Sequence, residues 1–246
     1  MYRYHILIEY VGTPFIGWQI QKKGNSIQRK IQLSLSKLLK QKIILYGSGR
    51  TDSGVHALEQ SAHFDVKNKI QNIDKLIKSL NFFLNEKKIS IIDIKKKKFN
   101  FHARYSAKER SYIYIIQNRL SPSVLKKDRE WHIRKKLDLN LIKKGSKKLI
   151  GKHDFSTFRA SNCNAKSPIR TINKIIITKS QNRITLKFKS KSFLKNQVRS
   201  MVGCLKYLGE KKWNIKEFEK IIKKKDRRNV APPAPACGLY LEKIIY

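Results

Sequence analysis

Hydrophobic and polar residues alternate in several short stretches of the chain, which is the pattern of β-strands with one buried face. In the first stretch Tyr4, Ile6, Ile8 and Tyr10 fall on one side of the strand. Short apolar runs of similar length recur along the chain, bounded by polar or turn-forming residues. The pattern predicts strands at residues 4–10, 43–46, 60–66, 89–94, 111–116, 172–178, 183–189 and 237–241.

Other stretches repeat apolar residues every three or four positions, as helices with one buried face do. Ser26 stands before the first of them and is a good N-cap residue. Gly209 stands after the last and is of the type that commonly follows a helix C-terminus. The spacing predicts helices at residues 27–39, 74–84, 137–150 and 193–208.

The order strand, helix, strand recurs in both halves of the chain, which predicts the α+β class. We expect two similar subdomains, each with a mostly antiparallel sheet flanked by helices, and a central cleft between them. The boundary is expected between Phe99 and Arg110, giving subdomains of residues 1–105 and 106–246.

Charge is the most unusual feature of the composition. The 246 residues include 56 Lys and Arg but only 17 Asp and Glu, a formal net charge of +39. Such an imbalance produces strong self-repulsion that a polyanionic partner relieves, although a compositional bias toward lysine explains part of it. The lysine run at residues 95–98 is more typical of a solvated edge or linker than of a binding site.

Other classes of site and location are not indicated. Cys163, Cys204 and Cys237 are widely spaced without a C-x-x-C pair, so neither a disulfide framework nor a metal site is expected. No apolar run approaches the ~18 residues of a membrane span. The N-terminal residues lead into strand-like sequence instead of a signal-peptide core. We expect a cytoplasmic protein without a membrane segment.

Candidate chemistry concentrates in residues 47–57, which read GSGRTDSGVHA. Three glycines in eight positions allow the backbone to turn sharply or to lie close to a ligand. Asp52 stands among them, two residues after Arg50. If the two side chains meet, the guanidinium favours the ionised carboxyl group at neutral pH. A reactive carboxylate on such a loop is a plausible catalytic device.

Three other interpretations of this loop compete with a catalytic one. Gly49 and Gly54 have the spacing of a phosphate-binding loop, but Val55 and His56 follow where Lys and Ser or Thr are required. A dinucleotide fingerprint is disfavoured because Asp52 stands at the place of its third glycine and would repel pyrophosphate. The third interpretation is a polar turn in which Asp52 caps the next segment.

The complete string resembles the signature of the tRNA pseudouridine synthase A family, Gly-Arg-Thr-Asp followed closely by Gly-Val-His. Further stretches similar to the family lie in order along residues 4–245. They are the Tyr-x-Gly and Gly-Trp-Gln stretch at 10–19, Phe-His-Ala-Arg at 101–104, Asp-Phe-x-x-Phe-Arg at 154–159, Val-Arg-x-x-Val-Gly at 198–203 and Gly-Leu-Tyr-Leu at 238–241.

This resemblance implies an isomerase that converts uridine to pseudouridine at positions 38, 39 and 40 of the tRNA anticodon stem-loop. It also implies catalysis in the cleft between the subdomains, a homodimer and no cofactor. The chief alternative is a non-enzymatic RNA-binding protein, which explains the charge equally well but not a carboxylate at the centre of the loop. Ser53, Ser111 and the stretch 195–197 depart mildly from the family pattern.

The family also implies roles for four residues. Asp52 would be the catalytic residue, acting as nucleophile or general base. Arg199 would pair with this carboxylate, Arg50 would help to hold it, and Tyr112 would stack on the target base. From periodicity alone, Tyr112 is a core or surface aromatic residue. At about 100° per residue, Arg199 lies away from the apolar stripe of its helix, as a surface cation would.

Overall fold

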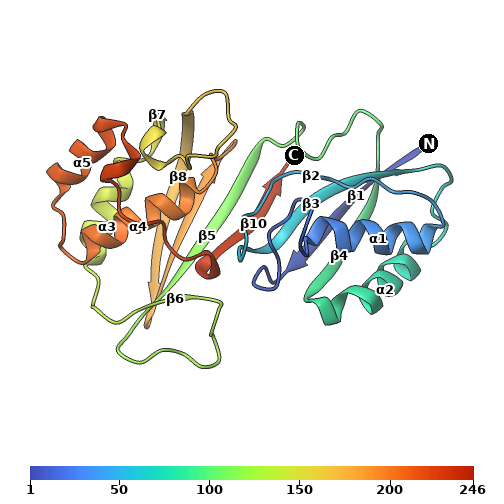
Figure 1. Ribbon diagram of the computed structural model, residues 1–246, viewed down its shortest axis with the longest axis horizontal. Coiled ribbons are helices and arrows are strands. Elements are labelled where there is room, and N and C mark those ends of the chain that lie inside the picture. The colour runs from blue at the N-terminus through green and yellow to red at the C-terminus, as the bar shows by residue number, and fades with distance from the viewer. The chain divides into compact units, whose positions relative to one another are not determined.

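The computed structural model describes residues 1–246, except for the side chain of Asn229. It has the expected α+β class, with helices flanking mostly antiparallel sheet (Figure 1). The chain forms two compact units: unit 1 is Met1–Lys108 with Tyr240–Tyr246, and unit 2 is Glu109–Leu239. The subdomain division at 105/106 stays a prediction; the units differ from it by grouping Tyr240–Tyr246 with the N-terminal part.

Unit 1 is a sheet with two helices packed beside it. Its strands follow the order β4–β1–β3–β10, and a short β2 pairs with β3. β1 is antiparallel to both β3 and β4, whereas β10 is parallel to β3. The helices α1 and α2 lie side by side (Figure 1). The elements are β1 (Tyr2–Tyr10), α1 (Ile27–Leu39), β2 (Tyr46–Gly47), β3 (His56–Val66), α2 (Ile73–Leu84), the 3₁₀ turn η1 (Asn85–Lys87), β4 (Ile89–Lys97) and β10 (Leu239–Ile245).

Unit 2 contains the remaining strands and three helices that contact one another. The strand order is β5–β9–β8–β7, all antiparallel, and β6 pairs in parallel with β5. The elements are β5 (Glu109–Asn118), β6 (Trp131–Ile133), α3 (Leu139–Lys147), β7 (Gly151–Asp154), η2 (Ser156–Phe158), β8 (Ile169–Ser180), β9 (Arg183–Ser190), α4 (Gln197–Gly209), α5 (Ile215–Lys224), η3 (Arg227–Asn229) and η4 (Ala236–Gly238).

Of two expected helix ends, the N-terminal end of α1 is confirmed and the C-terminal end of α4 differs. Ser26 occupies the N-cap position of α1, but its side chain accepts no capping bond. The first helical N–H groups, of Ile27 and Gln28, donate instead to the carbonyls of Gly17 and Trp18. Gly209 is the last residue of α4 and not the residue after it. A Cβ there would lie 2.8 Å from Cδ1 of Ile142, so this glycine serves helix packing.

Three expected strands also differ. Residues 43–45 form no strand because side chains of α1 take their backbone bonds: Ser36 accepts from the Ile43 N–H, and Gln32 accepts from the Leu45 N–H. The lysine run 95–98 was expected to follow the strand 89–94. In the structure β4 continues through the run as far as Lys97, since an edge strand can expose lysines on both faces. Residues 236–238 form η4, so β10 begins only at Leu239.

The helix expected at 193–208 begins four residues later, at Gln197. Asn196 has a left-handed backbone, with φ of 62°, which a helix cannot continue through. The helix expected at 137–150 covers only Leu139–Lys147. β6, β7 and α5 were not expected. Among the described residues, no helix combines the length and apolar character needed to cross a membrane.

Candidate active site

The loop that carries Asp52, residues 48–55, connects β2 to β3 in unit 1; we call it the Asp52 loop. Asp52 is half-buried and Arg50 is exposed. A tight turn follows Asp52: its carbonyl accepts from the Val55 N–H at 3.2 Å, and Gly54 has a φ of 77°. Glycine is required there because side-chain-bearing residues rarely adopt this backbone region.

The residues on both sides of Asp52 are fixed by hydrogen bonds. The Thr51 hydroxyl is 2.7 Å from the Tyr10 hydroxyl, and the Thr51 carbonyl accepts from the Trp18 N–H at 3.1 Å. Before this point, the Gly49 carbonyl accepts from Nε2 of Gln60 at 3.0 Å. After it, the Ser53 hydroxyl donates to the Phe15 carbonyl at 3.0 Å. The loop therefore holds the Asp52 backbone in one place, which is what a catalytic side chain needs.

Gly12 and Gly17 allow the backbone of the segment 12–19 to contact the backbone of the Asp52 loop. A Cβ on Gly12 would lie 2.0 Å from the Val55 carbonyl oxygen. A Cβ on Gly17, whose φ is 113°, would lie 2.7 Å from the Thr51 carbonyl oxygen. Only glycine permits these contacts, which explains in physical terms why Gly residues stand in this segment.

His56, the last residue of the Gly-Val-His string, has a structural role in unit 1. Its Nδ1 accepts from the Gly12 N–H at 3.0 Å, so the ring is anchored to the neighbouring segment. The ring also stacks on Tyr240, with 4.6 Å between centroids. His56, Tyr10 and Gln60 thus support the Asp52 loop. Sequence reasoning missed these roles; the Gly-Val-His string was the signal available for His56.

A group of rings positions the start of the same loop. Tyr46, in β2, stacks on His63 with 5.0 Å between ring centroids, and Nδ1 of His63 accepts from the Ala103 N–H at 3.2 Å. Burial lowers the pKa of His63 to about 4, with the nearby His102 and Arg3 adding to the effect. His63 is therefore neutral at pH 7, as its acceptor role at Nδ1 requires. The Phe-His-Ala-Arg segment is bound to the sheet by these contacts.

Tyr112 lies on β5 in unit 2. It is 9% exposed and pairs in register with Phe188 of β9. Its ring meets the Phe193 ring edge-on, with 5.2 Å between centroids. The surroundings are those of an aromatic residue at the margin of a core, and its stacking role stays a prediction.

Arg199 lies in the first turns of α4 and is half-buried, not the surface cation that helical spacing indicates. Its Nε donates to the Ala234 carbonyl at 2.7 Å, while the Arg199 carbonyl accepts from the Ala234 N–H at 3.0 Å. The segment 231–236 packs closely here, since a Cβ on Gly203 would lie 2.2 Å from the Pro232 carbonyl oxygen. One edge of the guanidinium is thereby fixed, and no hydrogen bond between described residues uses its Nη atoms.

The four predicted site residues are thus distributed over both units. Asp52 and Arg50 belong to unit 1, and Tyr112 and Arg199 belong to unit 2. The pairing of Asp52 with Arg199 therefore stays a prediction. No group of three or more His, Cys, Asp or Glu side chains suited to a metal ion occurs among the described residues.

Comparisons with known proteins agree with the motifs. A family model described as tRNA pseudouridine synthase matches residues 6–106 and 146–246, two separate segments that agree with two similar halves. The chain is 64% identical over 246 residues to the tRNA pseudouridine synthase A of Pelagibacter ubique (strain HTCC1062), with 100% of both chains covered.

Two further relatives carry the same name. The protein of Neorickettsia sennetsu (strain ATCC VR-367 / Miyayama) is 42% identical over 99% of this chain and 100% of its own length. The protein of Paramagnetospirillum magneticum (strain ATCC 700264 / AMB-1) is 41% identical over 100% of this chain and 96% of its own. The chain belongs to the tRNA pseudouridine synthase family, as its motifs predicted.

Proposed function

We propose that the protein isomerises uridine to pseudouridine at positions 38, 39 and 40 of the tRNA anticodon stem-loop, with Asp52 as the catalytic residue. The observation that carries the proposal is the placement of this carboxylate in a chain of net charge +39. A carboxylate repels RNA phosphates, so an Asp at this place weakens RNA binding unless it takes part in the reaction. Here the surrounding backbone is fixed by four hydrogen bonds from neighbouring segments.

The reaction is an internal rearrangement. The N1–C1′ glycosidic bond breaks, the uracil turns within the site, and C5 bonds to C1′. C5 then loses its proton while N1 gains one, so that atoms balance without a co-substrate. Asp52 acts either as a nucleophile on the ribose or base, or as a general base; both routes need an ionised carboxylate held close to the nucleotide.

Arg199, Arg50 and Tyr112 complete the proposed site. Arg199 pairs with the Asp52 carboxylate through the Nη atoms that no described hydrogen bond uses, while its Nε stays on the Ala234 carbonyl. Arg50 adds a second positive charge near the carboxylate. Tyr112 stacks on the uracil ring, since a flipped-out base needs a flat aromatic partner. This arrangement requires a cleft between the subdomains 1–105 and 106–246.

A homodimer and a cytoplasmic location complete the proposal. The homodimer rests on the family resemblance, and the cytoplasmic location is the expectation from the sequence. Sedimentation of the purified protein tests the first: a mass near twice 28.9 kDa supports the homodimer, and a mass near 28.9 kDa at micromolar concentration contradicts it.

Tritium release tests the reaction and its positions. Stem-loop RNAs with a single C5-tritiated uridine at position 38, 39 or 40 are incubated with the protein, and an RNA with its labelled uridine outside positions 38–40 is the control. Release from each of the three positions but not from the control is expected. Binding of the RNA without release from any position would favour the non-enzymatic RNA-binding alternative.

A further inference from the structure

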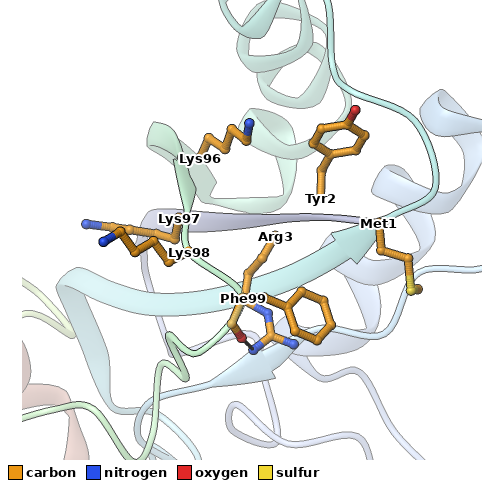
Figure 2. Close-up of a pocket in the computed structure, with 7 residues that line it drawn as sticks. All are labelled: Met1, Tyr2, Arg3, Lys96, Lys97, Lys98 and Phe99. Atoms are coloured by element: carbon orange, nitrogen blue, oxygen red, sulfur yellow. Dashed lines mark hydrogen bonds between the residues drawn. The ribbon is translucent and has the colours of Figure 1, made fainter.

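A cationic pocket at the outer edge of the unit 1 sheet is not used by the motifs or by the proposed chemistry. Its volume is about 510 Å³, within the range of small-ligand sites. We call it the lysine-edge pocket, and Figure 2 shows its residues. They come from the start of the chain with β1 and from the end of β4 with the two residues after it: Met1, Tyr2, Arg3, Lys96, Lys97, Lys98 and Phe99.

Arg3 forms a rigid floor for this pocket. Its Nε and Nη2 each donate to the Asp65 carboxylate at 2.7 Å. Its Nη1 donates to the carbonyls of Phe99 at 2.6 Å and Phe101 at 2.8 Å. The Asp65 carboxylate neutralises the Arg3 charge, and the guanidinium fixes the backbone that carries Phe99. Arg3 therefore organises the pocket rather than supplying its free charge.

The free charge comes from three consecutive lysines. Lys95 is paired with Asp93 at 2.8 Å, but no ion pair among the described residues involves Lys96, Lys97 or Lys98. All three are exposed. The ammonium groups of Lys96 and Lys97 lie over the rings of Tyr2 and Phe101, 5.1 and 5.6 Å from their centroids, and in Figure 2 Lys97 and Lys98 extend in the same direction. Three positive charges so close together repel one another, and a polyanion relieves that repulsion.

An exposed aromatic ring accompanies these charges. Phe99 is 59% exposed, and its ring lies over the Arg3 guanidinium, 4.4 Å from centroid to Cζ. Lysines on an edge strand also prevent edge-to-edge pairing of sheets, which accounts for the charges alone. It does not account for a large exposed Phe beside them. Exposed aromatic rings next to lysines are the usual surface for unpaired nucleotides, because the base stacks while the phosphate meets a cation.

The pocket is remote from the Asp52 loop within unit 1. β1 connects the two: Arg3 is at the pocket, and the Tyr10 hydroxyl bonds to Thr51 in the loop. Seven residues of strand at about 3.3 Å each separate them by roughly 23 Å. A nucleotide in the pocket is therefore not the uridine that reacts.

We propose that the lysine-edge pocket binds an unpaired nucleotide of the tRNA. This nucleotide lies about 20 Å or more from the target uridine, because the length of β1 separates the pocket from the Asp52 loop. Lys97 and Lys98 contact its phosphates and Phe99 stacks on its base. The inference rests on the proposed function, since it takes tRNA as the substrate.

Salt-dependent binding of full-length tRNA tests the pocket. The variants are Lys97→Gln/Lys98→Gln and Phe99→Leu, and the control is Lys216→Gln/Lys220→Gln on α5, which removes two exposed lysines elsewhere. Losing two phosphate contacts should flatten the slope of log affinity against log salt by about 1.4–1.8. Phe99→Leu should weaken binding about tenfold with an unchanged slope. The control should change neither the salt slope nor the tRNA affinity by as much as these variants do.

Two further readouts separate this pocket from general charge. Bound tRNA should protect Lys97 and Lys98 from acetylation more than Lys216 and Lys220, whereas inorganic phosphate at the same phosphate concentration should protect none of them. In turnover, the Lys97→Gln/Lys98→Gln variant should raise KM about tenfold and leave kcat unchanged, because the pocket is remote from the reacting atoms.

Failure of the pocket and failure of the function give different results. Tritium release by the wild type, with equal salt slopes and KM values for the two lysine variants, would overturn the pocket and leave the function intact. Protection of Lys97 and Lys98 by tRNA without tritium release would support the pocket and overturn the function. Protection by inorganic phosphate alone would show an anion site that does not select RNA.

Discussion

The Asp52 loop and the lysine-edge pocket lie in the same unit, yet they are built in opposite ways. In the loop, backbone contacts and hydrogen bonds fix the residues on both sides of one carboxylate. In the pocket, three exposed lysines have no ion-pair partner among the described residues, and only aromatic rings contact the ammonium groups of Lys96 and Lys97. Chemistry requires a fixed group, whereas phosphate binding requires only charge near a flexible chain. Substitutions should therefore affect stability and kcat at the loop, and affinity at the pocket.

The largest stability effect is expected from Gly12→Ala. The new Cβ would lie 2.0 Å from a backbone oxygen, that of Val55, so the Asp52 loop must shift. We expect the free energy of unfolding to fall by about 3 kcal/mol and kcat to fall about 100-fold. Urea unfolding and turnover measure the two. Pro14→Ala, an exposed change in the same segment, is the control. Equal behaviour of both variants would contradict the close contact.

A smaller loss should follow Thr51→Val, which keeps the shape of the side chain but removes its bond to the Tyr10 hydroxyl. Loss of this buried hydrogen bond should cost about 0.5–1.5 kcal/mol of stability, since Nε2 of Gln60 still donates to the Tyr10 hydroxyl at 3.5 Å. We expect kcat to fall about tenfold because the Asp52 loop becomes more mobile, with KM little changed. Ser53→Ala removes the bond of an exposed residue to Phe15, and should have a weaker effect. A change in KM alone would place Thr51 in substrate binding instead.

Stability should also depend on pH through His5 and His63. Their folded pKa values are about 4, against 6.5 for an unperturbed histidine, mainly because both rings are buried. Between these values the unfolded chain binds more protons, so stability is complete above pH 6.5 and is lost as the pH falls toward 4.

We expect a loss of about 1–2 kcal/mol per histidine over this window, measured by urea unfolding at several pH values. His63→Gln, which keeps an acceptor for the Ala103 N–H, should flatten the profile. An unchanged profile in that variant would show that His63 does not contribute.

The smallest stability effect is expected at the pocket. Lys97→Gln/Lys98→Gln should change the free energy of unfolding by less than about 0.5 kcal/mol, because exposed side chains without ion pairs contribute little. The same variant should lose tRNA affinity. A large loss of stability here would mean that the lysines hold β4 in place, and the contrast between the two regions would fail.

Local patterns predicted much of the fold. The α+β class and the two similar halves followed from the order of periodic segments, and the family followed from short motifs. α5 was missed although its signals were present: Asn214 and Glu217 form a capping box, and Phe218 is the buried residue of its apolar face. The predicted ends of elements were wrong where tertiary contacts determine them. Ser36 and Gln32, for example, accept the backbone hydrogen bonds that Ile43 and Leu45 would have donated within a strand.

The site was predicted only in part, since its supports are distant in sequence. Asp52 stood out because a motif surrounds it. The bond between Tyr10 and Thr51 joins residues 41 positions apart, and no periodicity predicts it. Arg199 shows the same limit: helical spacing indicated a surface cation, but a contact with Ala234, 35 positions away, half-buries it.

A single-turnover assay tests the central claim, that the Asp52 loop exists to hold a catalytic carboxylate. A stem-loop RNA is mixed with excess wild-type protein, Asp52→Asn, or Asp93→Asn, which removes a carboxylate from β4 as a control. Pseudouridine is then measured over time, with RNA binding in parallel. We predict that Asp52→Asn binds the RNA at least as tightly as wild type but reacts at least about 10⁴-fold more slowly, while Asp93→Asn reacts normally. A rate for Asp52→Asn within tenfold of wild type would contradict the account.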